Sequence, residues 1–330
     1  MARPRRALVM SGGGAKGSFQ VGVLEVLILE RGIDFDIFCG VSVGSLNAAF
    51  LAQAEAPKPA DEARSLANLQ EVFRRLRAVW LERITGNSAV FSKRLGGMAG
   101  IVSGSDSLYD STPLRRLIAA SIDPLRLKSS GRDLRIQYVS LETGVIHAVE
   151  ETDPRILDHV LASSSMPFLF PPVEVAGEHL VDGGLRDVTP LGQAFRAEPP
   201  PDEIYVLYAS PFELKPKELK DNWLGTKVNA FDFLGRTIEI LSDEIYLNDV
   251  DGAKLLNRVK ANWLKARTSV TDPAAKAEID DALKNIRTAT LVEVAPKDEI
   301  IANALDFAPE GIRRNYEYGR QLARERFPAL

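Results

Sequence analysis

Short apolar runs alternate with longer helix-like stretches over the first 54 residues of the chain. The apolar run at 6–10 predicts a buried strand, and the stretch at 16–31 predicts a helix after it. A second run at 36–40 and a second stretch at 45–54 repeat the same order. Strand–helix alternation of this kind is typical of a mostly parallel sheet with helices on both faces. The pattern therefore predicts an α/β fold.

The rest of the chain shows one interruption and then further strand signals. A polar, proline-bearing tract leads into a helical pattern at 60–84, and a glycine- and serine-rich surface segment follows it. Beyond Pro211 the pattern turns mainly helical, and an amphipathic stripe at 231–250 predicts a helix packed on the core. The strand signals stand at 134–144, 145–150, 178–184, 204–210 and 288–296.

Composition and charge narrow the class of protein. The 330 residues are 45% hydrophobic with a formal net charge of −4, which disfavours a nucleic-acid binder because phosphate contacts need a basic excess. Cys39 is the only cysteine, so neither an intramolecular disulfide nor a cysteine-based zinc site can form. No run approaches the roughly 18 consecutive apolar residues of a spanning helix, and the first apolar run is too short for a secretory signal. We expect a cytoplasmic protein that meets any membrane from the side.

A glycine-rich segment, SGGGAKGSF, joins the first predicted strand to the first helix. Gly12, Gly14 and Gly17 fit the G-x-G-x-x-G spacing of dinucleotide-binding loops. Such a fold also needs an acidic residue at the carboxyl end of the second strand, but Asp34 and Asp36 precede the apolar residues of that strand. A loop of this kind also exposes backbone N–H groups that suit an oxyanion. Nucleotide binding and oxyanion binding both stay open on these residues.

The second predicted strand ends in GVSVGS, which contains a G-x-S-x-G pattern centred on Ser42. An apolar strand before the serine and a small-residue helical stretch after it match the nucleophile elbow of serine hydrolases. Gly40 and Gly44 leave room for the sharp turn that lifts the serine clear of the sheet. Loops that follow adjacent parallel strands lie side by side, so we expect residues 12–17 to neighbour Ser42.

A nucleophilic serine needs a base, and Asp182 is the best candidate. It stands in HLVDGGL at the end of an apolar run, followed by Gly183 and Gly184, which presents its carboxylate at the same sheet edge as Ser42. Asp-Gly-Gly is also typical of a tight turn. All three histidines precede Asp182, so the usual order of Ser, acid and His would need an earlier acid that no motif recommends. They are His147, His159 and His179.

Four segments in this order resemble the patatin-like phospholipases: SGGGAKGSFQVGVL, GVSVGSLNA, ASSSMPFLFPPV and LVDGGLRDVTP. The resemblance covers about residues 6–210. It implies a three-layer α/β/α sandwich with a mostly parallel central sheet, which cleaves acyl esters of lipids with a Ser-Asp dyad and without a metal ion. By position, it makes Ser42 the nucleophile and Asp182 the base. It assigns the oxyanion hole to the loop Gly12, Gly13, Gly14, Ala15, Lys16 and Gly17.

Two positions depart from the family pattern. The family usually has Arg where this chain has Lys16, and Lys cannot make the bidentate contacts of Arg. The asparagine-rich continuation that the family has after Asp-Gly-Gly is replaced by LRDVTP, which brings in Asp187 and Val188. Neither change touches Ser42 or Asp182.

The resemblance also suggests a division of the chain. Residues 1–215 are expected to form the catalytic core, with 55–130 as an insertion that serves as a candidate lid or acyl groove. Residues 216–330 are expected to form a mainly helical C-terminal part packed on that core. An acyl pocket and the hydrophobic core are the two alternatives for three apolar residues of the third segment. They are Phe168, Leu169 and Phe170.

The function expected from these residues is hydrolysis of acyl esters in a lipid or membrane-surface substrate, through an acyl-enzyme and with no cofactor or metal ion. Three alternatives stay open: a serine esterase for non-lipid substrates, a nucleotide-binding protein that uses G-x-G-x-x-G, and a catalytically silent protein that keeps the fold. We expect no nucleic-acid partner and no transmembrane segment. The sequence carries no signal for the oligomeric state.

Overall fold

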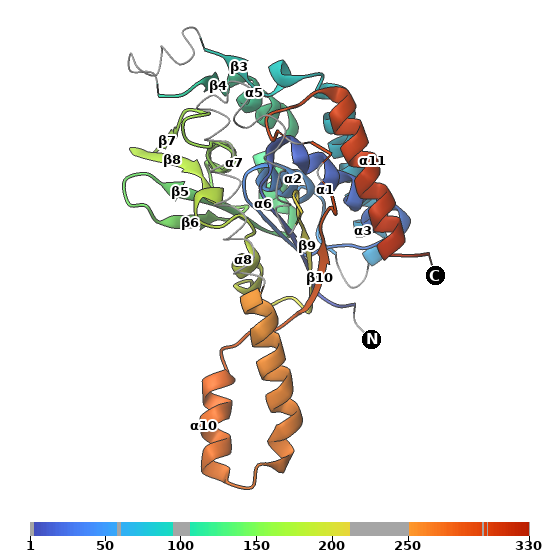
Figure 1. Ribbon diagram of the computed structural model, residues 1–330, viewed down its shortest axis with the longest axis vertical. Helices are drawn as coiled ribbons and strands as arrows, with labels where there is room; N and C mark the ends of the chain where they lie inside the picture. The colour runs from blue at the N-terminus through green and yellow to red at the C-terminus, as the bar shows by residue number, and fades with distance from the viewer. Residues whose placement is uncertain are drawn as a thin grey trace, which may run out of the picture.

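The computed structural model describes residues 3–57, 61–94, 106–211, 251–298, 300–301 and 303–329. A central sheet runs through this part of the chain (Figure 1). Its strands are β1 (Arg6–Met10), β2 (Ile37–Gly40), β5 (Asp133–Ser140), β6 (Ile146–Val149), β7 (Val173–Val175), β8 (Glu178–Asp182), β9 (Glu203–Leu207) and β10 (Thr290–Val294). Their order is β10-β9-β1-β2-β5-β8-β7, with β6 paired to β5. A separate two-stranded sheet pairs β3 (Ser92–Lys93) with β4 (Tyr109–Asp110).

The sheet is mostly parallel, with an antiparallel flank. β10, β9, β1, β2 and β5 run parallel to one another, whereas β6, β7 and β8 pair antiparallel. The central strands are buried on both faces, which explains why β1 and β2 read as continuous apolar runs rather than as alternating ones. The exposed residues of β6 and of the start of β8 belong to the antiparallel flank, which faces solvent on one side.

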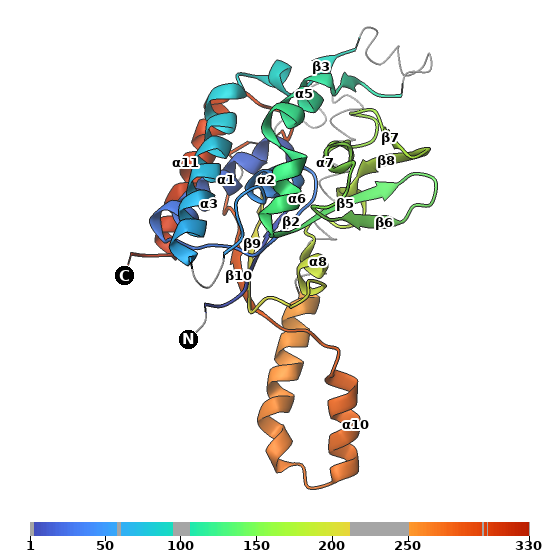
Figure 2. The same cartoon turned by 180° about the vertical axis from the view of Figure 1, so that it is seen from behind.

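Helices cover both faces of the sheet (Figure 2). Leu8 and Met10 of β1 pack with α1 and α2 in one cluster, whereas Ala7 and Val9 point to the other face and pack with α8. The predicted three-layer α/β/α sandwich is therefore confirmed. The helices are α1 (Gly17–Leu24), α2 (Val43–Leu51), α3 (Glu62–Ala78), α5 (Thr112–Ser121), α6 (Pro124–Ser130), α7 (Ile156–Ser163), α8 (Leu191–Phe195), α10 (Pro273–Leu283) and α11 (Pro309–Arg326).

Most predicted elements of the first 210 residues are present. The helix predicted at 16–31 is α1 continued by a π-helical turn, Glu25–Glu30, and the one predicted at 60–84 is α3 continued by a second, Val79–Arg83. The late apolar run forms β10, which pairs parallel with β9 and so joins the central sheet. The helix predicted at 231–250 lies outside the described residues.

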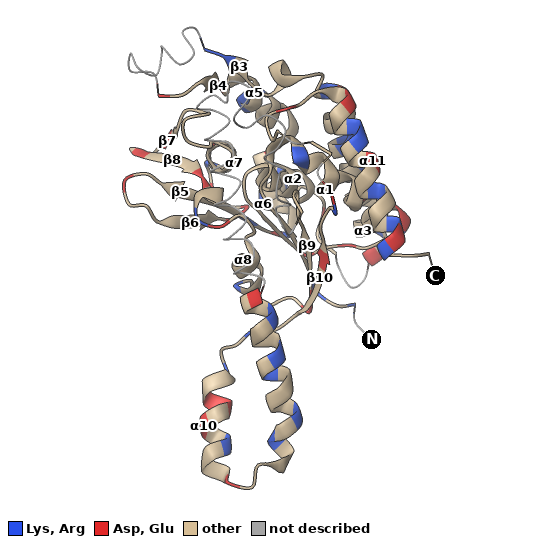
Figure 3. Cartoon of the chain, in the orientation of Figure 1, with Lys and Arg blue, Asp and Glu red and all other residues tan. Residues whose placement is uncertain are grey.

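A helical hairpin projects away from the sandwich (Figures 1 and 2). Within the described ranges, residues 251–266 belong to its first helix, and α10 is its second. Trp263 donates a hydrogen bond to Asp280 at 2.9 Å, and Arg267 forms an ion pair with the same carboxylate at 2.5 Å. Lys and Arg residues recur along the first helix (Figure 3).

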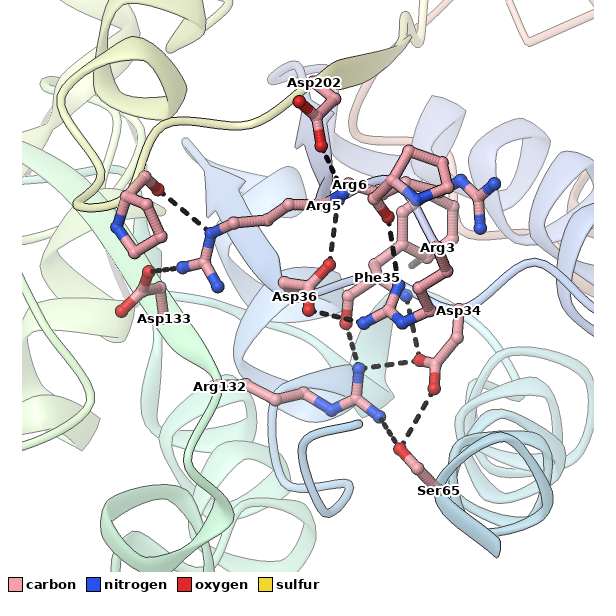
Figure 4. A network of polar contacts seen from close by, with 12 residues as sticks. Arg3, Arg5, Arg6, Asp34, Phe35, Asp36, Ser65, Arg132, Asp133 and Asp202 are labelled. Atoms are coloured by element: carbon pink, nitrogen blue, oxygen red, sulfur yellow. Dashed lines mark hydrogen bonds and ion pairs between the residues drawn. The ribbon is translucent and has the colours of Figure 1, made fainter. Parts of the chain in front are cut away.

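A buried arginine ties the amino end of β2 to the helices beside it (Figure 4). Arg132 pairs with Asp34 at 2.8 Å and donates to the carbonyls of Phe35 and Ala54, the latter at 2.9 Å. Nearby, Asp36 pairs with Arg3 at 2.5 Å. The carboxylates of Asp34 and Asp36 therefore stabilise the sheet at the edge opposite the glycine-rich loop. Their position before the apolar residues of β2 predicts this location.

Candidate active site

Ser42 occupies a sharp turn between β2 and α2. Its backbone has φ 53° and ψ −128°, a strained conformation for a residue with a side chain. The flanking glycines are needed because there is no room for a side chain. A Cβ on Gly40 would lie 2.3 Å from the Gly44 carbonyl oxygen, and one on Gly44 would lie 2.2 Å from the Met10 oxygen. The local geometry is that of a nucleophile elbow.

Three other serines hold this strained backbone. The Ser42 N–H donates to Ser163 Oγ at 3.0 Å, while Ser164 Oγ and Ser45 Oγ donate to the Ser42 carbonyl at 3.2 and 2.6 Å. Ser163 ends α7 and Ser164 follows it, so a segment about 120 residues away in sequence fixes the elbow. The pattern of the sequence does not predict this role. The serine run in ASSSMP is its only signal, and that run indicates the family resemblance alone.

Asp182 reaches the elbow from the last residue of β8. Asp182 is 1% exposed, and its carboxylate accepts the Gly184 N–H at 2.8 Å. Burial raises the pKa of Asp182 to about 7, against the opposing effects of the Gly184 N–H and of the nearby Ser42 side chain. Ser42 itself stays partly exposed. Ser42 is therefore in contact with solvent, whereas the carboxylate beside it is shielded from water.

The route by which Asp182 reaches this edge is set by strand register. β8 runs antiparallel to β5, and Asp182 pairs with Tyr138, two residues beyond the partner of Gly40 on β5. β5 extends past the end of β2. β8 therefore begins beside the extended end of β5 and runs back along it toward Ser42. Gly183 is then forced, because a Cβ there would lie 2.7 Å from the Gln137 carbonyl oxygen.

The glycine-rich loop lies against the elbow. A Cβ on Gly12 would be 3.2 Å from the Cβ of Ser42. Four of the six N–H groups of the loop are already engaged: Gly12 donates to Val188, Ala15 to Ala304, Lys16 to Gly13 and Gly17 to Gly14.

The remaining N–H groups of the loop are those of Gly13 and Gly14. Within the described part of the chain, no acceptor forms a hydrogen bond with either of these N–H groups or with the N–H of Val43. The family resemblance assigns all six loop residues to the oxyanion hole and does not single out Val43, although its N–H opens helix α2 directly after Ser42. The G-x-S-x-G pattern itself carried that signal, since the residue after the nucleophile commonly donates in such elbows.

A buried polar chain supports the loop from below. Gln20 Nε2 donates to the Ser11 carbonyl at 2.9 Å and to the Leu207 carbonyl at 3.1 Å. Asn47 donates to the Gln20 side chain at 3.1 Å, and Trp80 donates to Asn47 at 2.9 Å. The chain thus connects the start of the loop to α2 and to the turn after α3. Lys16 is buried beside it, with Nζ 3.4 Å from Ser210 Oγ.

The apolar residues expected near the acyl pocket separate into two environments. Phe170 is buried, with ring centroids 5.8 Å from Phe91 and 6.0 Å from Tyr109. Leu169 is partly buried against the same cluster. Phe168, in contrast, is 62% exposed and has φ 67°. The part of the insertion that lies at 95–105 is outside the described residues.

The histidines lie in other surroundings. His159 is buried and bonded to Asp153 at 3.2 Å, and His179 is exposed and bonded to Glu142 at 2.7 Å. His147 is exposed and stacks on Tyr138. Over the described ranges, no group of three or more His, Cys, Asp or Glu side chains is arranged to hold a metal ion.

A family model described as Patatin-like phospholipase matches residues 8–195, which is more than half of the chain. The chain belongs to the patatin-like phospholipase family. The matched range contains the glycine-rich loop, the elbow and Asp182, and it ends at the last residue of α8.

Curated relatives share this part of the chain at low identity. Lysophospholipase NTE1 of Cryptococcus neoformans var. neoformans serotype D (strain JEC21) is 27% identical over 77% of this chain and 14% of its own length. Patatin-like phospholipase domain-containing protein 7 of Rattus norvegicus is 29% identical over 57% and 12%. The Uncharacterized protein YjjU of Escherichia coli K12 is 27% identical over 58% and 49%. The chain thus matches half or less of the length of each of these relatives.

Among solved structures, VipD from Legionella pneumophila superposes with a TM-score of 0.42 and 14% identity, covering 98% of this chain and 67% of that one.

Family membership and the named relatives support a lipid hydrolase in general. In the part of the chain that the structure describes, no helix is both long and apolar enough to cross a membrane.

Proposed function

We propose that this patatin-like protein hydrolyses fatty-acyl esters of phospholipids or related lipids, with Ser42 as the nucleophile and Asp182 as the general base. The observation that carries the proposal is the proximity of these two side chains. A partly exposed serine in a strained elbow contacts a buried carboxylate whose pKa is about 7. A base with a pKa near the working pH combines adequate basicity with a large ionised fraction.

The reaction proceeds in two acyl transfers. Asp182 accepts the Ser42 proton as Oγ attacks the ester carbonyl, and the resulting tetrahedral intermediate collapses by expelling the alcohol. Asp182 returns its proton to that alcohol, which leaves the acyl group on Ser42. Water then enters and loses its proton to Asp182 as it attacks the acyl-enzyme. Collapse of the second intermediate releases the fatty acid, and Asp182 returns the proton to Ser42 Oγ, which restores the serine hydroxyl.

The negative oxygen of each intermediate needs donors that are open before the substrate arrives. The N–H groups of Gly13, Gly14 and Val43 are the candidates, and all three lie in the loop or at the start of α2. The positive end of the α2 dipole adds to their effect. Loss of one such donor typically costs about 10²- to 10³-fold in rate.

The pH dependence follows from the raised pKa of Asp182. The carboxylate must be ionised to accept the serine proton, and its pKa is about 7 instead of the ordinary 3.8. We therefore expect kcat/KM for a soluble short-chain ester to rise as the pH increases through about 7 and to level off above it. Residual activity of Asp182→Asn should show no inflection there. A profile already flat from pH 5 upward would contradict the assignment.

A lipid substrate, rather than a soluble ester, is favoured by Phe168 as well as by family membership. Phe168 comes shortly after Ser163 and Ser164 in the sequence, and its ring is exposed. Its backbone has a conformation that phenylalanine rarely adopts. Backbone hydrogen bonds from Leu108 to the Phe168 carbonyl and from Tyr109 to the Leu169 carbonyl keep the segment in place. We propose that Phe168 contacts the acyl region of the lipid surface when the protein acts there.

Substitution of Phe168 by Ser is expected to lower fatty-acid release from phosphatidylcholine vesicles by roughly tenfold, because burial of one Phe in lipid is worth about 1.5–3 kcal/mol. The rate with a soluble short-chain ester should not change. Leu125→Ser is the matched control, since Leu125 is 77% exposed on α6, an element that does not contribute to the elbow. Equal losses on vesicles and on soluble ester would refute the lipid contact. A wild-type protein that cleaves only the soluble ester would favour the non-lipid esterase.

A further inference from the structure

The C-terminal part of the chain contacts the glycine-rich loop, although it lies outside the range that matches the family model. Two pieces of it are involved: the segment at 303–308 and helix α11, which runs beside α1 (Figure 1). Both lie more than 280 residues from the loop in sequence.

The first contact is made by backbone. The Ala15 N–H donates to the Ala304 carbonyl at 2.8 Å. The same oxygen approaches so closely that a Cβ on Gly14 would lie 2.2 Å from it. Gly14 also has φ 55°, which favours glycine. The turn of the loop is therefore shaped against the C-terminal segment.

The second contact is made by a buried amide on α11. Asn315 is 4% exposed, and its Nδ2 donates to the Lys16 carbonyl and to Ser18 Oγ, each at 3.0 Å. Ser18 Oγ in turn donates to the Ala15 carbonyl at 2.9 Å. Asn315 thus binds the Lys16 carbonyl directly and the Ala15 carbonyl through Ser18. These are the two residues that directly follow Gly14.

The position of Asn315 along the loop is fixed by close packing of α1 and α11. A Cβ on Gly22 would lie 2.0 Å from the Tyr316 carbonyl oxygen, and one on Gly319 would lie 2.3 Å from the Phe19 oxygen. Below this contact, Arg320 pairs with the buried carboxylate of Glu25 at 3.1 Å. Helix α11 cannot slide along α1 without breaking these contacts, so the amide of Asn315 keeps its register with the loop.

We propose that Asn315 is a positioning residue for the oxyanion hole: together with the Ala304 carbonyl, it holds the loop so that the N–H groups of Gly13 and Gly14 face the reacting carbonyl. The inference rests on the proposed function. The peptide groups that directly follow Gly14 make these hydrogen bonds. Without the hydrogen bonds the loop can rotate, and the N–H groups of Gly13 and Gly14 can turn away from Ser42. Displacements of about 1 Å at a reacting centre typically cost on the order of 10²-fold in rate.

The test compares Asn315→Leu with a matched variant on the same helix. Asn315→Leu removes both hydrogen bonds and is expected to lower kcat for a soluble ester by about 10- to 100-fold with little change in KM. The rate of covalent labelling by a fluorophosphonate should fall by a similar factor, and amide hydrogen exchange in the peptide 11–19 should accelerate. Leu322→Ala truncates a buried side chain two turns away, so it should lower the melting temperature and leave kcat unchanged.

A second variant keeps α11 intact. Ser18→Ala removes the hydroxyl that links Asn315 to the Ala15 carbonyl, and it should produce a smaller fall in kcat, again without a change in KM. Unchanged kcat and unchanged exchange at 11–19 in Asn315→Leu would overturn the proposal, as would an equal loss of kcat in Leu322→Ala. If the wild-type protein neither cleaves esters nor reacts with the label, the proposed function fails, whereas the exchange data still decide whether Asn315 holds the loop.

Discussion

Substitution of Asp182 by Asn is expected to lower kcat by about 10²- to 10⁴-fold, the range in which a positioned general base contributes. Asparagine has nearly the same shape and can still accept the Gly184 N–H, which Asp182 accepts at 2.8 Å. It cannot take the proton of Ser42 at any pH used for the assay. Fatty-acid release and soluble-ester hydrolysis should therefore fall together, with little effect on KM. Full activity in this variant would contradict the role of Asp182.

The same variant should fold, and its stability provides the control. The pKa of Asp182 is raised from 3.8 to about 7 in the folded state, so the folded protein holds this proton more tightly than the unfolded chain does. That contribution to stability is complete below about pH 4 and is lost as the pH rises through about 7. The asparagine side chain of the variant does not ionise. We therefore expect the variant to melt no lower than the wild type at pH 8, and the difference to shrink in acid.

Substitution of Arg132 by Met is expected to destabilise the fold by about 3–5 kcal/mol, because it leaves a buried carboxylate without its partner. The Arg132 side chain is 0% exposed and pairs with Asp34 at 2.8 Å (Figure 4). It also donates to the carbonyls of Ala54 and Glu55 at 2.9 and 2.6 Å, which fixes the exit of α2. Chemical denaturation with circular dichroism measures the change.

Two controls separate a buried ion pair from ion pairs in general. Arg115→Met breaks an exposed pair with Asp158, so it should cost no more than about 1 kcal/mol. Arg132→Met combined with Asp34→Asn should recover part of the loss, because the uncompensated charge is gone. A denaturation midpoint for Arg132→Met equal to that of the wild type would show that the network does not stabilise the sheet.

Local patterns in the sequence are sufficient to predict the parallel half of the fold and the sharp turn at Ser42. Continuous apolar runs predict β1 and β2. The glycines around Ser42 predict the tight turn in which Ser42 has its positive φ. The sequence also predicts that Asp182 lies at the same sheet edge as Ser42, but the strand that carries Asp182 runs antiparallel to β5. Its level relative to Ser42 depends on how far β5 extends past β2. That register is set by pairing between distant segments and leaves no periodic signal.

The residues that support the site could not be found in the same way. Ser163 holds the elbow backbone and Asn315 holds the loop, yet each stands in a helix whose pattern shows only which face is apolar. A single buried serine or asparagine in a helix has no spacing that reveals its partner. Phe168 and Phe170 illustrate the same limit, because two similar residues in one short motif end in opposite environments.

The central claim is that Ser42 forms a covalent acyl intermediate with Asp182 as its base. The most direct measurement is fluorophosphonate labelling of the wild type, Ser42→Ala and Asp182→Asn, followed by mass-spectrometric mapping of the modified peptide, with fatty-acid release from phospholipid followed in parallel. We expect one label on Ser42 in the wild type, none in Ser42→Ala, greatly slowed labelling in Asp182→Asn, and fatty-acid release only where labelling is fast. A label on another residue, or fatty-acid release that survives in Ser42→Ala, would contradict the claim.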